Sequence, residues 1–219
     1  MLEWFKTFAS DDIGKTITGA FIALAAVALG ALLGVLKDLF VESAKRKRLA
    51  WLTAVRLTVI LDRYVDECAT HADDDGEADE KGYYRLRHPQ PDLVYPEDLA
   101  WTSLTKQLMY DAFKLKVRHD GTISGLDFLY NEVASPPDYG EYFAEKGEKI
   151  SRRGQDAVKL VGKLKRKYGV PTADRNEYSP QNTFDRVVEA YETRVAKREV
   201  RRQELERKRV QAGEPPDFI

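Results

Sequence analysis

An uncharged stretch of twenty-one residues, Thr16 to Leu36, limits what this 219-residue chain can fold into more than any other feature. It reads TITGAFIALAAVALGALLGVL, in a sequence in which 32% of the residues are charged. As a helix it rises about 1.5 Å per residue and spans about 30 Å, the thickness of the hydrocarbon core of a bilayer. The stretch therefore predicts a transmembrane helix over residues 16–36, after a short interfacial segment over residues 1–15.

Two other interpretations of this stretch fit less well. A secretory signal peptide has an apolar core of about 7–15 residues, a basic start and a cleavage site with small residues. Here the acidic residues Glu3, Asp11 and Asp12 precede a longer core. That core ends at Lys37 and Asp38 rather than at such a site. A buried helix of a soluble protein of this size rarely lacks charge on all its sides, so a membrane span is the better interpretation.

Basic residues lie mainly on the C-terminal side of the predicted span. Lys6 and Lys15 stand before it, whereas Lys37 follows it at once. A basic cluster comes next, made of Lys45, Arg46, Lys47 and Arg48. Because positively charged flanks stay in the cytoplasm, we expect the N-terminus outside and the remainder of the chain inside. The cluster would lie at the lipid headgroups, where each base contributes about 1 kcal/mol of attraction to anionic lipid.

The predicted span carries small residues at helical spacing. Gly30 and Gly34 form a G-x-x-x-G pattern, and Ala26 lies one turn earlier on the same face. Small residues four apart let two membrane helices approach closely, so the pattern predicts packing against another helix and a homo-oligomer. Since Gly is frequent in membrane helices anyway, the alternative is that these positions have no partner.

The sequence after residue 36 keeps a helical pattern and predicts a cytoplasmic antiparallel helical bundle over residues 37–171. Its first helix should run to about residue 70, because neither glycine nor proline occurs between Leu36 and Val65. The expected buried stripe is Ala50, Ala54, Leu57, Leu61, Tyr64 and Cys68, widened by Leu52, Val55, Val59 and Ile60. Cys68, the only cysteine, is expected to be a small buried side chain rather than a reactive thiol.

A loop is expected over residues 71–96, where a run of acidic residues is followed by three prolines. A second helix should begin at Pro96-Glu97-Asp98, because proline fits the first helical position and acids stabilise the positive end of the helix dipole. The pair Asp120-Gly121 should end this helix. A short helix is expected to follow near residues 123–134.

The most regular pattern in the chain, called here the seam, spaces eight residues alternately four and three apart. The seam consists of Phe143, Gly147, Ile150, Gly154, Ala157, Val161, Leu164 and Tyr168. Glycine inside a helix costs about 1 kcal/mol relative to alanine, so we expect the helix of residues 101–115 to approach closely at Gly147 and Gly154. The alternative is a weak helix that tolerates two glycines. The helix should end at Gly169, before Pro171.

A basic C-terminal helix and a disordered tail are expected over residues 172–219, with the helix starting at Ser179-Pro180. Its apolar positions give way to arginine in the same register: Phe184, Val188, Tyr191 and Val195 are followed by Arg198 and Arg202. The first half should therefore dock on the bundle, and the second half should project as a charged helix. Residues 213–219 are the expected disordered tail.

Two stretches resemble sequence elements of a known group of proteins. Residues 91–101 (PDLVYPEDLAW) resemble a P-x-x-x-x-P-E-D-x-x-W element. Residues 154–171 (GQDAVKLVGKLKRKYGVP) resemble a G-x-x-A-x-x-L-x-x-x-L-[KR]-x-x-Y-G-[VL]-P element. Both are similar to parts of functionally uncharacterised bacterial single-span membrane proteins with a helical cytoplasmic region. The resemblance implies a location in the bacterial inner membrane, and it implies no activity.

The sequence predicts no enzyme, no cofactor and no metal site. Laid on an EF-hand loop, the acidic segment places His71 at the first position and Gly82 at the twelfth, where calcium needs Asp and a bidentate Glu. His71, His88 and His119 have unrelated spacings, and one cysteine cannot complete a zinc site. Phosphate-binding glycine loops, dinucleotide fingerprints and nucleophile elbows do not occur. A looser cation site in the acidic loop and a catalytic site assembled from distant residues stay open.

Acidic and basic residues are segregated along the chain, although the formal net charge is −1. Residues 66–80 hold eight acidic residues and no Lys or Arg, whereas residues 194–209 hold eight basic and three acidic ones. The basic residues can be a solvated helix face with Glu–Arg pairs, a lipid-binding surface or a nucleic-acid surface. Nucleic acid is the least expected partner, because the C-terminal helix lacks the interleaved aromatic residues of a stacking surface.

These patterns predict an all-α protein with one N-terminal transmembrane helix, a cytoplasmic helical bundle and a projecting charged C-terminal helix. The function that fits them best is a membrane-anchored scaffold or adaptor for an unknown protein partner. One alternative is a membrane effector or regulator that acts through oligomerisation of its span. The other is a membrane tether for nucleic acid.

Overall fold

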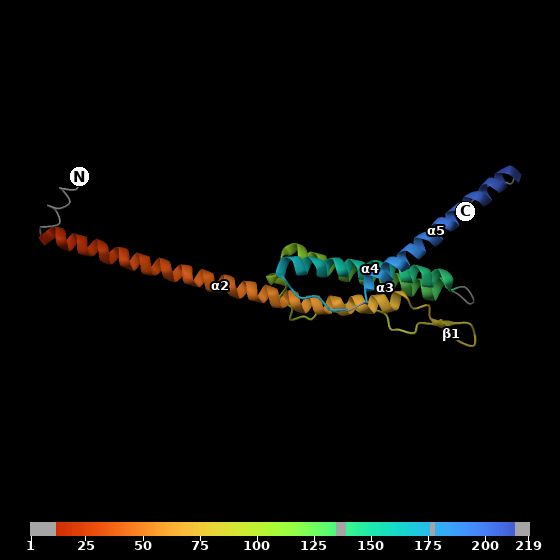
Figure 1. The fold of residues 1–219 in the computed structure, drawn as a ribbon, viewed down its shortest axis with the longest axis horizontal. Coiled ribbons are helices and arrows are strands. Elements are labelled where there is room, and N and C mark those ends of the chain that lie inside the picture. The colour runs from red at the N-terminus through yellow and green to blue at the C-terminus, as the bar shows by residue number, and fades with distance from the viewer. Residues whose placement is uncertain (1–11, 135–138, 176–177, 213–219) are drawn as a thin grey trace. The chain divides into compact units, whose positions relative to one another are not determined.

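The structure, a computed structural model, describes residues 12–134, 139–175 and 178–212, and within these the side chains of residues 12–23, 25, 210 and 212 are not described. The described part of the chain is mostly helical, which confirms the all-α class (Figure 1). Residues 1–49 and 50–219 form two compact units. The boundary between the units lies within helix α2, Asp12–Ala72.

The first unit consists, in its described part, of the N-terminal portion of α2. Every side chain described between Leu24 and Leu49 is exposed, including those of Leu24 and Phe40, which are each 73% exposed. Among the described residues, no helical segment combines the length and the apolarity that a membrane crossing requires. Residues 1–11 of the predicted interfacial segment, and most side chains in the first half of the predicted span over residues 16–36, lie outside the described residues. The span stays a prediction.

The second unit begins with the C-terminal portion of α2, which carries the expected buried stripe. Ala54, Leu57, Leu61 and Cys68 have no exposed surface, and Tyr64 has almost none. The stripe is narrower than predicted, because the Leu52 and Val59 side chains are exposed. They lie on the side of α2 that faces away from the core formed by the other helices.

The loop after α2 contains a small hairpin. Strand β1, Glu77–Ala78, pairs antiparallel with strand β2, Tyr84–Arg85. Gly76 and Gly82 flank β1 with φ angles of 71° and 81°, a left-handed conformation that favours glycine. The acidic residues that follow α2 are therefore folded into a hairpin with residues 84–85, and they do not form an open loop.

Helix α3, Lys106–Phe128, differs from the predicted helix at both ends. It begins ten residues later than expected, because the Thr105 side chain accepts the N–H of Leu108 and so caps the N-terminus of α3. Before it, the chain forms the short 3₁₀ helix η1, Trp101–Ser103. Asp98, expected in the first helical turn, instead accepts a hydrogen bond from Arg56 at 2.8 Å.

The predicted break at Asp120-Gly121 is also wrong, since α3 passes through it. His119 and Leu126 are both buried on the same face, so packing on either side of the glycine maintains the helix. The expected short helix near residues 123–134 is therefore the end of α3, followed by one π-helical turn, η2, Leu129–Val133.

Helices α4, Gly140–Tyr168, and α5, Pro180–Ala212, complete the second unit. Gly169 ends α4 with a φ of 64° and its N–H donates to the Lys165 carbonyl, as the Gly-Val-Pro sequence predicted. The core joins α2, α3 and α4 with one side chain of α5, Phe184, which has no exposed surface. In Figure 1, α3 and α4 lie beside the C-terminal part of α2. Residues 213–219, the predicted disordered tail, lie outside the described residues.

Candidate interaction surfaces

The seam of α4 faces the core for most of its length. The buried members are Gly147, Ile150, Gly154, Ala157, Val161 and Leu164. Phe143 and Tyr168, at its two ends, are partly buried and pack against the same core. The Tyr168 hydroxyl accepts the backbone N–H of Thr105 at 3.1 Å, which ties the end of α4 to the start of α3.

The two seam glycines leave space for α5 and for the end of α2. A Cβ built on Gly154 would lie 2.2 Å from Cζ of Phe184, and one on Gly147 would lie 3.0 Å from the Ala72 carbonyl oxygen and from Cγ1 of Val187. The expectation that the helix of residues 101–115 approaches these glycines is therefore wrong. The segments that need the space are the first part of α5 and, at Gly147, the end of α2.

A buried lysine, which the sequence analysis did not identify, closes the C-terminal end of α2. Lys146 has no exposed surface, and its Nζ donates to the carbonyls of His71, at 2.8 Å, and of Asp74. Burial lowers the pKa of Lys146 to about 8, although Asp74 acts in the opposite direction. The ammonium group satisfies the His71 carbonyl, which the end of α2 leaves without a helical partner, and the Asp74 carbonyl of the loop that follows. One signal was present in the sequence: Lys146 follows Phe143 and precedes Ile150 at helical spacing.

Two more buried polar groups surround this lysine. Burial and the Lys146 charge lower the pKa of His71 to about 4, and its Nδ1 has no hydrogen-bond partner among the described atoms. Asp74 is also buried, and burial alone would raise its pKa. Hydrogen bonds from the N–H groups of Gly76, His88 and Arg87, together with the Lys146 charge, outweigh this effect and hold the pKa of Asp74 below its usual value. The cluster is closed to solvent, and its arrangement holds the hairpin against α2 and α4.

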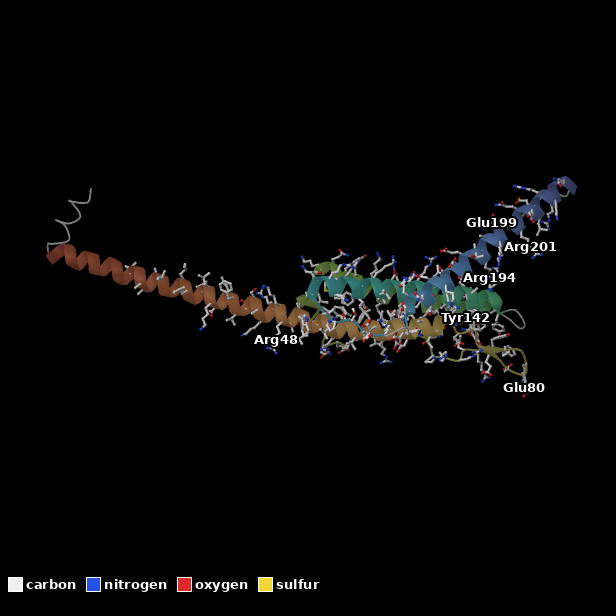
Figure 2. The ribbon with its side chains drawn as sticks, in the orientation of Figure 1. Arg48, Glu80, Tyr142, Arg194, Glu199 and Arg201 are labelled. Atoms are coloured by element: carbon white, nitrogen blue, oxygen red, sulfur yellow. The ribbon has the colours of Figure 1, made fainter. Side chains whose placement is uncertain are left out.

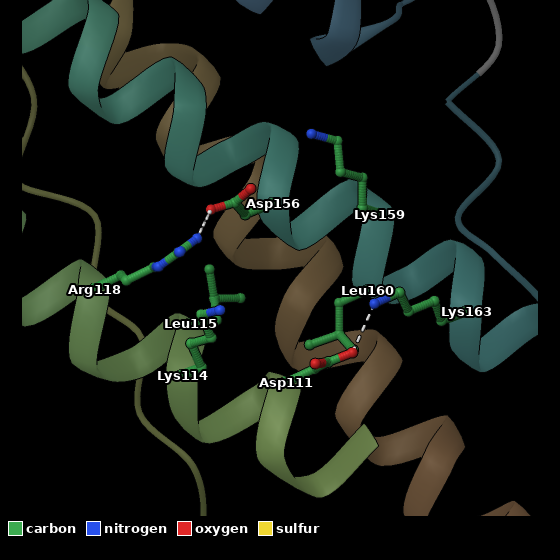
Figure 3. A pocket seen from close by; sticks show the side chains of 8 residues that line it. All are labelled: Asp111, Lys114, Leu115, Arg118, Asp156, Lys159, Leu160 and Lys163. Atoms are coloured by element: carbon green, nitrogen blue, oxygen red, sulfur yellow. Dashed lines mark hydrogen bonds and ion pairs between the residues drawn. The ribbon is translucent and has the colours of Figure 1, made fainter. Parts of the chain in front are cut away.

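A charged groove of about 170 Å³ lies between α3 and α4 (Figure 3). Its wall carries two ion pairs between the helices, Lys163–Asp111 at 2.6 Å and Arg118–Asp156 at 3.4 Å. Lys114 and Lys159 add two more positive charges to the lining. The groove is large enough for a small anion, but its arginine and one of its lysines already pair with carboxylates.

A larger groove, of about 500 Å³, lies where α4 meets α5 and the hairpin. Its lining combines aromatic and charged side chains: Tyr84, Tyr139, Phe143, Tyr191, Asp73, Asp75, Arg186 and Arg194. Arg186 of α5 pairs with Asp73 at 2.8 Å, which joins the docked part of this helix to the acidic segment after α2.

The C-terminal half of α5 is free of the core. From Glu192 to Arg209 every residue is exposed, and Figure 2 shows Arg194, Glu199 and Arg201 along it. Arg194 donates to the Gly140 carbonyl at 3.0 Å and Arg198 pairs with Glu141, so side-chain contacts with α4 continue for two turns past the last partly buried residue, Tyr191.

The residues predicted to meet lipid or a second span all lie in the first unit. Ala26, Gly30 and Gly34 are exposed, and among the described residues no atom lies within 4 Å of a Cβ built on either glycine. The basic cluster of residues 45–48 is exposed, with Arg46 paired to Glu42.

The described residues contain no group of three or more His, Cys, Asp or Glu side chains that could hold a metal ion. Cys68 is buried, as predicted, and burial raises its pKa to about 12. His119, also buried, lies 3.0 Å from the Tyr64 hydroxyl through its Nδ1, which gives this histidine a structural partner within the core.

The surfaces described above define a helical bundle joined to an exposed apolar helix. Comparison of the chain with protein-family models, curated proteins and solved structures found no match.

Proposed function

We propose that this chain is a membrane-anchored scaffold or adaptor of the bacterial inner membrane. Residues 16–36 cross the bilayer, the N-terminus lies outside, and the helical bundle holds a protein partner at the cytoplasmic face. The basic cluster of residues 45–48 lies at the headgroups. Self-association of the span through Ala26, Gly30 and Gly34 belongs to the same proposal.

The observation that carries this proposal is the exposure of apolar side chains on α2. Leu24, Val27, Leu32 and Phe40 are among those exposed, and in the first unit no described side chain is buried. Exposed apolar surface costs about 25 cal/mol per Å² relative to an apolar environment. A bilayer removes this cost for a helix that is apolar on all its sides, whereas one protein groove would cover a single face.

The second unit supports a role in recruitment. Its core is closed, and the exposed half of α5 presents bases together with Val195, Val200 and Leu205. Beyond Arg198, which pairs with Glu141 of α4, this exposed half has surface available for a partner. The basic residues of α5 would attract a partner with an acidic surface.

The anchor is tested with Leu29→Arg combined with Leu33→Arg. Each arginine at the centre of a membrane helix costs about 2.5–3.5 kcal/mol, so we expect the variant to leave the membrane fraction. Fractionation of cells without detergent, followed by carbonate extraction, measures this. Val200→Arg with Leu205→Arg on α5 is the matched control and should stay in the membrane. Wild-type protein in the soluble fraction would contradict the proposal.

Recruitment is tested by reversing charges on α5. Arg201→Glu, Arg207→Glu and Lys208→Glu together should remove the partners that cross-link to the chain in intact membranes, because an acidic surface no longer meets bases. The charge-preserving variant Arg201→Lys, Arg207→Lys and Lys208→Arg should retain them. Identical cross-linked partners in both variants would mean that α5 is not the recruiting segment.

A further inference from the structure

Helix α3 has an exposed apolar face opposite its buried one. Tyr110, Val117 and Phe128 follow one another at helical spacing and are 58%, 71% and 60% exposed. Phe113, beside them, packs on the Trp101 ring and is still 43% exposed. The core-facing residues Leu108, Ala112, Leu115, His119 and Leu126 lie on the other side of the helix. Lys114 lies on the same side, with its Nζ 5.9 Å from the centre of the Tyr110 ring. The large apolar residues of this face are therefore spread along α3 on the side that takes no part in the core.

Small residues interrupt this face in its second half. Gly121 and Gly125 lie in the middle of the helix, where each costs about 1 kcal/mol relative to alanine. Among the described residues, no atom lies within 4 Å of a Cβ built on either of them. Within the second unit nothing accounts for the two glycines, in contrast to Gly147 and Gly154.

Charge divides α3 and its π-helical end into two halves. Residues 106–119 contain the bases Lys106, Lys114, Lys116 and Arg118 and the single acid Asp111. Residues 120–133 contain the acids Asp120, Asp127 and Glu132 and no Lys or Arg. Asp111 and Arg118 pair with α4, and Lys116 pairs with Asp120 of the same helix. The remaining charges, Lys106 and Lys114 in the first half and Asp127 and Glu132 in the second, attract an antiparallel copy of the helix and repel a parallel one.

We propose that the exposed face of α3 is a homodimer interface, in which α3 of one chain packs antiparallel on α3 of a second copy. The spacing of large and small residues supplies the register. The pairs Tyr110 and Phe128, Phe113 and Gly125, and Val117 and Gly121 all have His119 as their midpoint. A two-fold axis at the level of His119, but on the exposed side of the helix opposite its side chain, thus sets the Phe113 and Val117 side chains of each copy over the glycines of the other.

The charges follow the same register. Lys106 and Glu132 also have His119 as their midpoint, and both side chains are exposed. Each lies at the rim of the proposed interface opposite its counterpart in the second copy. Because the interface repeats the same patch on both chains, it closes after two copies and gives a dimer rather than a filament. It needs neither the membrane span nor Gly30 and Gly34, and it goes beyond the adaptor proposal.

Cross-linking of the full-length chain in detergent tests the proposal. Tyr110→Cys and Phe128→Cys are made separately and treated with a short bismaleimide, alone and as an equal mixture. The two positions are about 27 Å apart along one helix. Antiparallel packing predicts covalent dimer in the mixture and only background in each variant alone. Wild-type protein, whose single Cys68 is buried, is the control for background.

The outcomes separate the alternatives. Cross-linking of each variant with itself would mean parallel packing and would overturn the proposal, and so would a monomer with no cross-link in the mixture. Gly30→Leu with Gly34→Leu should leave the cross-link in the mixture unchanged, so a failure of the span hypothesis is distinguished from a failure of this one. A cross-link lost in that variant would assign the dimer to the span.

Charge reversal gives a second measurement. Lys106→Glu should lower the dimer association constant about fivefold, because two rim attractions become repulsions. Adding Glu132→Lys to the same chain should restore it, since each pair is then reversed as a whole. Light scattering over a protein concentration series measures both variants. Equal association constants for Lys106→Glu and wild type would contradict the register.

Discussion

Replacing Gly154 by alanine is expected to destabilise the bundle, although alanine is the better helix former by about 1 kcal/mol. The new methyl group would lie 2.2 Å from Cζ of Phe184 and within 2.7 Å of two further ring atoms. Phe184 has no exposed surface, so its ring cannot move without displacing other core side chains. Overpacking of this kind costs about 1–3 kcal/mol.

Gly154→Leu should have a larger effect. Its side chain would take the place of the Phe184 ring, and loss of a buried phenylalanine costs about 3–5 kcal/mol. Denaturation by urea, followed by circular dichroism of the full-length protein in detergent, measures the free energy of unfolding. We expect α5 to detach in this variant, so that trypsin cuts after Arg186 in the docked part of the helix; the exposed bases of residues 194–209 are accessible in the wild type as well.

A matched control lies in the same helix. In Gly162→Ala the new Cβ would meet only Nη1 of Arg166, at 3.6 Å, so this variant should be as stable as wild type or gain up to about 1 kcal/mol. A second control combines Gly154→Ala with Phe184→Leu, whose smaller side chain leaves room for the methyl group. Equal stability of Gly154→Ala and Gly162→Ala would show that the Phe184 ring does not require this glycine.

The seam illustrates what the sequence could predict. A strict four-three spacing specifies one face of one helix, and that face is defined by the residues of α4 alone. The residues of α4 do not define which helix packs on that face, because several helices with apolar faces could approach the same glycines. Phe184 and Val187 of α5 fill the space that the sequence analysis had assigned to residues 101–115.

The errors at α3 have a similar origin. Pro96 and its neighbouring acids match a helix start, but Asp98 pairs with Arg56, which is distant in sequence. Gly121 matches a helix end, but the buried His119 and Leu126 keep the helix intact across it. Local start and stop signals were therefore overridden by contacts that no single segment contains.

Lys146 was missed for a different reason. A lysine in a helix with a strongly polar composition is usually exposed, and its burial depends on two carbonyls more than seventy residues away in sequence. The role of His71 was equally hidden, since it requires α4 to cover the end of α2. Both residues form a buried polar cluster whose effect on stability depends on pH.

Acid is expected to destabilise the bundle through His71. Its pKa is about 4 in the folded chain, compared with an ordinary value of 6.5, because it is buried beside the Lys146 ammonium group. The unfolded chain therefore binds a proton between these pH values that the folded chain does not. Stability is fully present above pH 6.5 and falls as the pH decreases towards 4, at up to about 1.4 kcal/mol per pH unit.

The variant His71→Gln should lose this dependence. Its backbone carbonyl still accepts the Lys146 hydrogen bond, but its side chain does not titrate. Between pH 7 and pH 4 the wild type should therefore lose about 2–3 kcal/mol more stability than the variant. Urea denaturation at constant ionic strength measures both. His119, whose pKa burial also lowers, adds a loss of stability that is common to both proteins.

The exposed His88 provides the matched control, because its backbone N–H, and not its side chain, holds Asp74. His88→Gln should keep the acid sensitivity of the wild type. If His71→Gln kept it as well, proton uptake by His71 would not be the cause, and Asp74 would be the next group to replace. If only His71→Gln abolished it, the polar cluster at the end of α2 would be the part of the bundle that acid opens first, since protonated His71 would face the Lys146 charge with almost no access to water.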